Sequence, residues 1–365
     1  MVFSSLVFLC IFLPTVFLLY TLVPSLKFRN GLLIVASLIF YAYGEPVYVL
    51  LMIFSSLLNY ICARLVANEN AKRKLVLVLA VVINLGILAV FKYSGFFVES
   101  LNSVTGLAIP VPQIDLPIGI SFFTLQAVSY LFDVYRGLIK ADDNILRLAL
   151  FMSFFPQIVE GPICRYGQTA NQLWNVKQIE FENLKLGAVR ILFGLMKKLV
   201  IADRLNPMIK QIFSHYDDYQ GGIIALGAIA YTIQLYCDFS GTMDAVMGVA
   251  QIFGVTMPEN FQRPFFSKSI SEFWKRWHIT LGTWFKDYIF YPVTMSKPMK
   301  NLTSSARKKL GNHFGPLLAG SIALFCVWFC NGLWHGSAWG YILLRYVPLC
   351  AYPVGQTSLP LRLPS

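Results

Sequence analysis

The sequence predicts an all-α protein that crosses a lipid bilayer several times. Hydrophobic residues make up 56% of the 365-residue chain and charged residues only 13%, about half the charged share of an average soluble domain. A single water-facing fold cannot bury so much apolar surface. Long apolar runs recur along the chain, and helices are one of the two structures that satisfy every backbone polar group in lipid.

The apolar runs predict the helices in order. The first run, Ser5 to Pro24, has about the 20 residues that cross a hydrocarbon core, and no cleavage pattern follows it, so we interpret it as a retained helix. Further apolar runs cover residues 31–43, 46–66, 75–93, 117–134, 145–159, 184–199, 222–236, 243–253 and 316–333. Several are shorter than a full crossing, which predicts half-helices or re-entrant pieces among them.

Basic residues predict the orientation of the first helices. With the N-terminus outside, Lys27 and Arg29 fall inside and Glu45 falls outside. The next loop, between Arg64 and Lys74, is again basic and falls inside, so the positive-inside rule holds three times in succession. The sequence beyond Pro117 leaves the topology open.

Charge and cysteine content exclude several classes of function. The formal net charge of +12 is typical of basic loops held against anionic lipid, and we find no basic-aromatic module that would bind nucleic acid. The seven cysteines are scattered through mostly apolar runs, without a CxxC pair or a histidine at metal-ligand spacing. We interpret them as small core residues and expect neither a metal site nor a bound cofactor.

The longest polar interval is predicted to be cytoplasmic. Pro258 to Gly315 carries ten basic and three acidic residues. Within it, residues 273–291 place an aromatic stripe opposite Lys275, Arg276 and Lys286, which predicts one amphipathic helix at the membrane interface. The stripe consists of Trp274, Trp277, His278, Leu281, Trp284, Phe285 and Tyr288. We expect the basic face to attract anionic headgroups or an acidic acyl carrier protein.

Two histidines are candidate catalytic residues. His335 is the only titratable group in the segment Asn331 to Trp339 at the end of an apolar run, where Trp334 could line a cavity. An imidazole can take a proton from a hydroxyl and return it to a leaving thiolate, as acyl transfer from a thioester requires. His278 lies on the aromatic stripe and is flanked there by Trp274, Trp277 and Trp284. The alternatives are a hydrogen-bonded structural histidine at 335 and an interfacial anchor at 278.

Two further segments carry polar residues at membrane depth, where such residues are costly and often functional. Asp238 and Asp244 flank Ser240, and the adjoining glycine predicts a break between two half-helices that would bring these groups into a site. The alternative is helix capping together with pairing to Lys or Arg. Gln157 lies in the proline- and glycine-interrupted segment 155–166, which either lines a cavity or forms a kink.

Together these segments resemble the membrane-bound O-acyltransferase family, in its bacterial branch of alginate O-acetyltransferases and teichoic-acid D-alanyl transferases. The resemblance extends from the N-terminus to about Trp339. It rests on an ordered series of motifs at residues 40–46 (FYAYGEP), 117–123 (PIGISFF), 155–157 (FPQ), 238–241 (DFSG), 258–261 (PENF), 271–278 (SEFWKRWH) and 333–336 (LWHG).

The resemblance implies a fold, an activity and partners. The fold would be a ring of transmembrane and re-entrant helices around a central funnel, in the cytoplasmic membrane of a bacterium. His335 would act as general base and His278 as the second catalytic histidine. The donor would be acetyl-CoA or an acyl carrier protein, and the acceptor an exported polysaccharide or an extracytoplasmic partner protein. Residues expected to bind substrate or line the funnel are Asp238, Ser240, Trp274, Trp277, Trp334, Gln157 and Asn331.

The chain is expected to hold one membrane domain, residues 1–344, followed by an irregular tail at 345–365. Four prolines, Pro348, Pro353, Pro360 and Pro364, exclude a spanning helix from this tail. Because family members usually continue through further apolar helices, the tail is expected to be truncated or frame-shifted. Three alternatives stay open: a teichoic-acid D-alanyl transferase, an inactive fragment that binds a partner, and a secondary transporter, although the repeated halves typical of transporters are not found.

Overall fold

The computed structural model describes residues 2–69, 72–176 and 179–344, and helices are its only regular elements there. Within these residues, five helices are long and apolar enough to cross a membrane, and a shorter apolar helix spans Val7–Leu22. The five are Leu26–Gly44, Val49–Ala67, Arg73–Thr105, Gly221–Ile252 and Gly315–His335. The predicted all-α, multi-span class is therefore confirmed. The expected irregular tail at 345–365 lies outside the described residues.

The chain divides into two compact units, which we call the first unit and the second unit. The first unit contains residues up to 81 together with 117–260, and the second contains 82–116 together with the chain from 261 onward. The helix α4 (Arg73–Thr105) contributes to both. It is about 50 Å long at 1.5 Å per residue, and it continues well beyond the predicted run 75–93.

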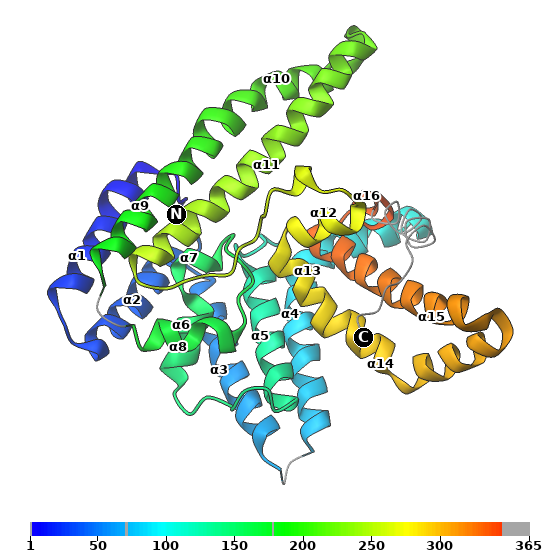
Figure 1. Cartoon of the computed structure of the whole chain (residues 1–365), viewed down its shortest axis with the longest axis horizontal. Helices are drawn as coiled ribbons and strands as arrows, with labels where there is room; N and C mark the ends of the chain where they lie inside the picture. The colour runs from blue at the N-terminus through cyan, green and yellow to red at the C-terminus, as the bar shows by residue number, and fades with distance from the viewer. Residues whose placement is uncertain (1, 70–71, 177–178, 345–365) are drawn as a thin grey trace. The chain divides into compact units, whose positions relative to one another are not determined.

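The first unit is a bundle of helices around a core of aromatic rings (Figure 1). Phe40 packs against Phe8 and Phe155, each with ring centroids 5.7 Å apart. Phe155 packs in turn against Phe253 at 5.9 Å. The helices are η1 (Val7–Phe12), α1 (Leu13–Leu22), α2 (Leu26–Gly44), α3 (Val49–Ala67), α5 (Ile120–Tyr135), α6 (Ile145–Ser153), α7 (Phe155–Ile158), α8 (Tyr166–Trp174), α9 (Phe181–Leu195), η2 (Met196–Ala202), α10 (Asp203–Ser214), η3 (Tyr216–Asp218) and α11 (Gly221–Ile252).

Local sequence signals place several helix starts. The Oγ of Ser25 accepts a hydrogen bond from the amide of Phe28 at 3.5 Å and caps α2. Gly119 precedes α5 with a φ of 78°, a left-handed conformation that favours glycine. A Cβ atom at Gly119 would lie 2.1 Å from the carbonyl oxygen of Ile158. The start of α5 therefore packs closely against the end of α7.

The predicted break at Ser240 and Gly241 is wrong, because α11 runs without interruption from Gly221 to Ile252. The glycine serves close packing instead. A Cβ atom at Gly241 would lie 2.7 Å from the carbonyl oxygen of Gly194 in α9, and one at Gly194 would lie 2.4 Å from the carbonyl oxygen of Gly241. Membrane helices commonly bring small residues together in this way so that their backbones can approach.

The second unit contains the remainder of α4 and the helices that follow residue 261. These are η4 (Pro264–Phe266), α12 (Ile270–Arg276), α13 (Ile279–Phe285), η5 (Lys286–Phe290), α14 (Tyr291–Met295), α15 (Lys297–His335) and α16 (Trp339–Leu344). Helix α15 has non-helical backbone angles at Gly311, where φ is 82°. The apolar run predicted at 316–333 is its C-terminal part.

The single amphipathic helix predicted over residues 273–291 is wrong, because α12 ends at Arg276 and α13 begins after His278. The cause is a pairing with a distant segment. The amide of Gln262 donates a hydrogen bond of 3.0 Å to the carbonyl oxygen of Arg276, and Phe261 and Trp277 form an antiparallel bridge. These contacts use backbone groups that a continuous helix would need.

A capped first turn starts α12. The Oγ of Ser269 accepts a hydrogen bond from the amide of Glu272 at 3.1 Å. The carboxylate of Glu272 accepts one from the amide of Lys268 and also pairs with Arg276 one turn later, at 2.5 Å. The backbone hydrogen bond from Lys268, with a further contribution from Arg276, lowers the pKa of Glu272. This cap fixes the start of the short helix that carries Trp274.

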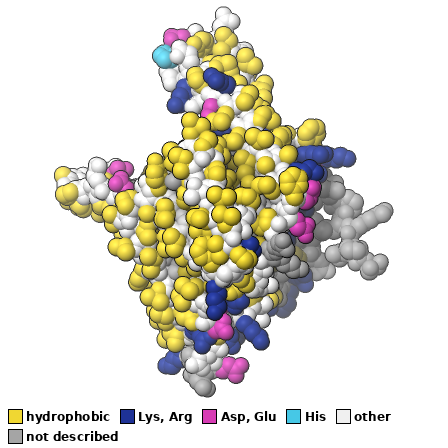
Figure 2. All heavy atoms as spheres, turned by 90° about the vertical axis from the view of Figure 1, so that its left-hand side faces the viewer, with side chains coloured by type: hydrophobic (Ala, Val, Ile, Leu, Met, Phe, Trp, Pro, Cys, Tyr) yellow, Lys and Arg dark blue, Asp and Glu magenta, His cyan; other side chains and the backbone are white. Residues whose placement is uncertain are grey.

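Apolar side chains cover much of the face of the molecule shown in Figure 2, and charged side chains gather mainly at its margins. Large hydrophobic residues of the candidate spanning helices are exposed, among them Val35 and Ile39 of α2 and Leu50 of α3. Exposed apolar surface on long apolar helices is what contact with lipid requires.

The close contact between α9 and α11 gives a prediction about stability. Replacing Gly241 by alanine places a methyl group where the backbone of α9 lies, and overpacking of this kind typically costs about 1–3 kcal/mol. We therefore expect Gly241→Ala to lower the midpoint of thermal unfolding in detergent. Gly222→Ala, in the same helix but with no atom within 4 Å of the added Cβ, is the matched control and should leave the midpoint unchanged or raise it. Equal midpoints for the two variants would contradict the packing role of Gly241.

Candidate functional site

The motifs that carry the family resemblance separate into two groups in the structure. Those at residues 40–46, 117–123, 155–157 and 238–241 belong to the first unit, and those at 271–278 and 333–336 belong to the second. The motif at 258–261 contains the boundary between the units. The candidate site residues therefore form two groups, which are described in turn.

In the second unit, the indole of Trp334 contacts both candidate histidines. Its ring centroid lies 5.8 Å from that of His278, with the ring planes at 64°. It lies 4.9 Å from that of His335, with the planes at 89°. The predicted residues His278, Trp334 and His335 thus form one cluster, which we call the histidine cluster.

Both histidines stand at helix ends. His278 is buried, with 5% of its surface exposed, and its φ of 48° places it in the left-handed region immediately before α13. Residues other than glycine seldom adopt this conformation, and strained positions of this kind concentrate at functional sites. His335 is the last residue of α15 and is half-buried. The helix holds the backbone of a residue at its end. The side chain of that residue can still contact groups beyond the last turn.

Asn331 lies one turn before His335 on α15, and residues four apart share a helix face. Asn331 is buried, and within the described part of the chain its side-chain carbonyl oxygen has no hydrogen-bond partner. Leaving a buried acceptor without a donor is costly. An acceptor in this position is suited to receive a hydrogen bond from a ligand hydroxyl or a water molecule.

Trp274 of α12 and Trp277, which directly follows this helix, pack against different partners. Trp274 packs edge-on against Trp328 of α15, with centroids 4.9 Å apart. Trp277 stacks on Phe273 at 5.6 Å and meets Phe261 edge-on at 5.1 Å. Trp274 therefore joins α12 to the helix that ends in His335, and Trp277 anchors the segment that leads into His278.

Sequence reasoning missed two residues of α4 beside this cluster. The ammonium group of Lys92 donates a hydrogen bond to the carbonyl oxygen of Trp334 and lies 5.9 Å above the centroid of its indole ring. The hydroxyl of Tyr93 donates to the carbonyl oxygen of Leu333. The last carbonyls of a helix lack partners within the helix, so these two side chains cap the end of α15. A lysine inside a long apolar run was the signal that could have found them.

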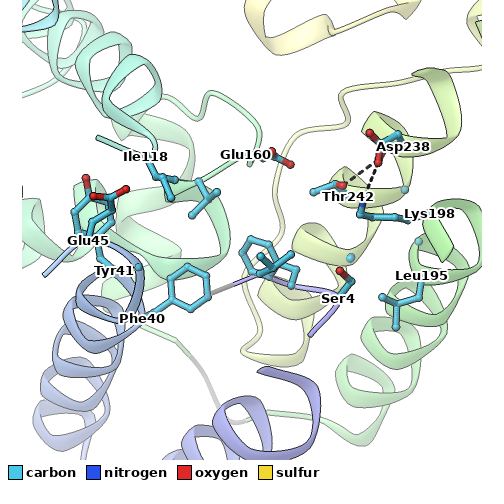
Figure 3. Close-up of a pocket in the computed structure, with 17 residues that line it drawn as sticks. Ser4, Phe40, Tyr41, Glu45, Ile118, Glu160, Leu195, Lys198, Asp238 and Thr242 are labelled. Carbon is cyan, nitrogen blue, oxygen red and sulfur yellow. Dashed lines mark hydrogen bonds and ion pairs between the residues drawn. The ribbon is translucent and has the colours of Figure 1, made fainter. Parts of the chain in front are cut away.

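In the first unit, Asp238 lines a cavity of about 370 Å³. Figure 3 shows Lys198 and Asp238 on one side of it and Tyr41 and Glu45 on the other. Phe40, Ile118, Glu160, Leu195 and Thr242 are among the other lining residues. Four of the motif segments therefore meet at or next to one cavity. Gln157 and Ser240 are buried but do not belong to its lining.

Ion pairs connect η2 to α11 around this cavity. The ammonium group of Lys198 lies 2.6 Å from a carboxylate oxygen of Asp238, and that of Lys197 pairs with Asp244 and lies 3.1 Å from the Oγ of Ser240. Asp238 and Asp244 lie inside the continuous helix α11, so pairing, and not capping, accounts for them. Charges on apolar helices require such partners.

Sequence reasoning also missed these lysines, although both lie in the run 184–199. They occupy η2, a π-helical segment, and π-helical turns often mark functional sites. The wider turn directs two consecutive lysines toward α11. Arg190, one further basic residue of α9, pairs with Asp244 at 3.1 Å and with Glu259 at 2.6 Å.

Glu160 and Gln157 lie in the interrupted segment, which the structure breaks as predicted into the four-residue helix α7 and an irregular stretch. The amide nitrogen of Gln157 donates a hydrogen bond to the carbonyl oxygen of Phe151. Glu160 lines the cavity and is exposed. Desolvation by the surrounding protein raises the pKa of Glu160; the nearby Asp238 adds to this rise and Lys198 opposes it.

Comparison with known proteins decides the family. The sequence model of the membrane-bound O-acyltransferase family matches residues 139–307. The chain is 38% identical over 352 residues to the protein named “Probable alginate O-acetylase AlgI” of Azotobacter vinelandii, covering 94% of this chain and 66% of that protein. It is 30% identical over 376 residues to the “Peptidoglycan O-acetyltransferase” of Helicobacter pylori, covering 94% and 68% respectively. The chain belongs to the membrane-bound O-acyltransferase family.

A third relative of this family resembles a shorter part of the chain. The “Teichoic acid D-alanyltransferase” of Bacillus subtilis is 32% identical over 236 residues, covering 62% of this chain and 55% of that protein. The chain spans about two thirds of the length of the curated relatives that it matches over most of its own length. Family membership confirms the resemblance drawn from the motifs, and it favours the acyltransferase interpretation over the transporter alternative.

The cap on α15 gives a prediction. Lys92→Met removes the donor to the part-buried carbonyl oxygen of Trp334 at similar side-chain length, and loss of such a hydrogen bond costs about 1 kcal/mol or more. We expect the variant to unfold at a lower temperature in detergent, while Lys92→Arg, which keeps a donor, recovers most of the loss.

Lys74→Met is the matched control, because Lys74 is an exposed residue near the start of the same helix. This substitution should leave the unfolding midpoint nearly unchanged. A Lys92→Met protein as stable as the Lys74→Met protein would show that the capping contact contributes nothing measurable.

Proposed function

We propose that this chain is a membrane-embedded enzyme that moves an acetyl group from a cytosolic thioester donor to a hydroxyl group of an exported polysaccharide. The donor would be acetyl-CoA or an acyl carrier protein, and a relay partner outside the membrane could receive the group first. Family membership supports acyl transfer, and the relatives named as O-acetylases or O-acetyltransferases support acetyl as the group. The observation that carries the proposal is the contact of Trp334 with both His278 and His335.

In the proposed mechanism His335 is the general base. Its neutral imidazole accepts the proton of the acceptor hydroxyl while the hydroxyl oxygen bonds to the carbonyl carbon of the thioester. The carbon–sulfur bond then breaks, and the imidazolium returns its proton to the leaving thiolate. The products are an oxygen ester on the acceptor and a free thiol on the donor, so atoms and charges balance.

The neighbouring residues would position the reacting groups. His278 also contacts the ring of Trp334, and its left-handed backbone stands immediately before α13. Its role would be to orient the donor or to stabilise the developing oxyanion. Asn331, with a buried acceptor on the same helix face as His335, would hold a substrate hydroxyl. Trp274 and Trp277 would line the site.

The proposal includes a cellular setting. The protein would lie in the cytoplasmic membrane of a bacterium with its N-terminus outside, and residues 1–344 would act as one membrane domain. Its partners would be the lipid bilayer, the polysaccharide acceptor, an extracytoplasmic transfer protein and, where the donor is protein-bound, a cytosolic acyl carrier. The basic residues between Pro258 and Gly315 would face that carrier.

A second candidate is D-alanyl transfer to teichoic acid, which the Bacillus subtilis relative supports. That similarity covers 62% of this chain, whereas the similarity to the Azotobacter vinelandii relative covers 94%. The greater coverage favours acetyl transfer. The mass of the group added to the exported glycan, acetyl or D-alanyl, separates the two candidates in one measurement.

The role of His335 gives the central prediction. In cells that depend on this protein for glycan acylation, His335→Gln should lower the acylation rate by about 10²–10⁴, because glutamine keeps hydrogen-bonding capacity but cannot accept and return a proton. Acylation is measured by mass spectrometry of the glycan, and protein yield in the membrane is measured in parallel. His215→Gln, at an exposed histidine in the first unit, should change neither quantity.

Two results would count against this mechanism. Near-normal acylation by His335→Gln would make His335 a structural residue. If the yield of His335→Gln protein falls by the same factor as acylation, the loss of acylation is due to folding and not to the missing base. His278→Ala should reduce turnover only partly if that residue orients the donor.

The orientation is tested by labelling across α4. Cysteines introduced in place of Glu69, before this helix, and Ser103, near its end, should react with a membrane-impermeant thiol reagent from opposite sides, in a background without reactive native cysteines. The loop at Glu69 should label from the cytoplasm, because basic residues surround it. Labelling of both positions from the same side would show that α4 does not cross the membrane.

A further inference from the structure

The first part of α15, residues 297–310, carries positive charge that the protein does not neutralise. We call this part the basic helix. Its basic residues are all exposed, and they are Lys297, Lys300, Arg307, Lys308 and Lys309. None of them has an ion-pair partner among the described residues, and the sequence contains no acidic residue after Asp287. The charge of the basic helix therefore remains for a ligand.

The lysines of the basic helix lie mainly on one side of it. At 3.6 residues per turn, Lys297, Lys300 and Lys308 fall within about 80° of one another around the helix axis. Ala306 falls on the opposite side and is only 6% exposed. Helix α15 packs against η5 and α14. The apolar side of the basic helix is therefore covered by protein, and its charged side faces outward.

The chain folds back directly after the basic helix. Gly311 has a φ of 82° and interrupts α15, and Figure 1 shows this turn in the orange part of the chain. A Cβ atom at Gly315 would lie 2.6 Å from the backbone nitrogen of Arg307. Gly315 is the first residue of the candidate spanning helix Gly315–His335. Arg307 and the two lysines that follow it therefore lie beside the point where that helix would enter the membrane.

Exposed apolar side chains precede the basic helix. In α14, Tyr291 is 42% exposed and Met295 is 65% exposed. The ammonium group of Lys286 lies 5.5 Å above the ring centroid of Tyr291. Lysines combined with exposed aromatic and apolar side chains are typical of the headgroup layer at the surface of a membrane.

We propose that the basic helix binds the headgroups of anionic phospholipids in the cytoplasmic leaflet of the membrane. An acidic soluble protein would also complement the charge, but only the bilayer is held beside the start of the spanning helix. Clusters of about four to eight basic residues next to a membrane crossing attract anionic headgroups in this way. Ser304, exposed on the same side as Lys300 and Lys308, can donate a hydrogen bond to a phosphate oxygen.

The inference uses the cytoplasmic placement predicted for the interval from Pro258 to Gly315, and it does not depend on acyl transfer. It assigns the basic residues of the basic helix to lipid. The basic residues that precede this helix remain for an acyl carrier protein where the donor is protein-bound.

The lipid preference of the full chain tests the inference. Purified protein in detergent is mixed with equal amounts of phosphatidylglycerol and phosphatidylcholine that have the same acyl chains, and the bound lipids are counted by native mass spectrometry. We expect bound phosphatidylglycerol to exceed bound phosphatidylcholine, and the ratio to fall as salt is added. Lys300→Gln combined with Lys308→Gln should lower the ratio about tenfold or more, because each basic residue near an anionic surface contributes about fivefold.

Two further double variants are the controls. Lys300→Arg combined with Lys308→Arg keeps both charges and should keep the ratio. Lys140→Gln combined with Lys210→Gln removes two exposed lysines of the first unit and should change the ratio little. The midpoint of thermal unfolding is measured for every variant, and we expect it to stay unchanged because all four lysines are exposed.

Several results would overturn the inference. The first is a ratio near one, or a ratio that salt does not lower, in the unmodified protein, a test that needs no variant. The second is an unchanged ratio in the Lys300→Gln, Lys308→Gln protein. The third is an equal loss in the Lys140→Gln, Lys210→Gln protein. If the Lys300→Gln, Lys308→Gln protein keeps its lipid ratio but no longer binds an acidic acyl carrier protein, the basic helix belongs to the carrier. The measurement uses neither donor nor acceptor, so its outcome is independent of the role proposed for His335.

Discussion

A charge on a membrane-spanning helix needs a partner, because the hydrocarbon interior supplies no water to solvate it. The first unit is organised around this requirement. Lys197 and Lys198 of η2 pair with Asp244 and Asp238 of α11, and the pairs form because Gly194 and Gly241 allow the two helices to approach closely. If one helix slid along the other, the ion pairs would break. Residues with a Cβ atom would then move into the close contact that only glycine allows, and they would collide with the facing backbone. Charge and close packing therefore set the same register.

The second unit meets a related requirement at the end of α15. The final carbonyls of a helix cannot bond within the helix, and here Lys92 and Tyr93 supply the donors. The capped residues, Leu333 and Trp334, immediately precede His335. The side chain proposed to move the proton is thus attached to a helix end whose backbone is held by two groups from α4. His278 is placed in a comparable way, since the bridge between Phe261 and Trp277 ends α12 just before it.

The sequence predicts which segments form helices better than it predicts where those helices begin, break and end. Apolar runs predicted the spanning helices because the thickness of the bilayer fixes their length. The break predicted at Gly241 failed because glycine serves both to interrupt helices and to bring helices together, and the sequence around Asp238 does not distinguish the two. The helix predicted over 273–291 failed because the hydrogen bond from Gln262 to Arg276 comes from a distant segment, which local periodicity does not record.

The same reasoning explains which site residues were predicted. His278, Trp334 and His335 were singled out because their types are unusual at apolar positions, and the structure brings the three together. Lys92, Lys197 and Lys198 are as unusual in their apolar runs, but the sequence does not show which groups they contact. Asp238 and Asp244 left two interpretations open, and only the positions of their lysine partners decide for pairing. Pairing depends on contacts between helices, which a pattern along one helix cannot supply.

The chemistry proposed for this chain, acyl transfer from a thioester, favours a histidine as the base. Attack of a hydroxyl on a thioester needs a base that is neutral and unpaired near neutral pH, which an imidazole satisfies better than a carboxylate. The carboxylate of Asp238 is already paired with Lys198, 2.6 Å away. Desolvation raises the pKa of Glu160, but this carboxylate lines the cavity of the first unit, whereas both candidate histidines belong to the second unit. The histidine cluster is therefore the group of residues best suited to moving the proton in the proposed reaction.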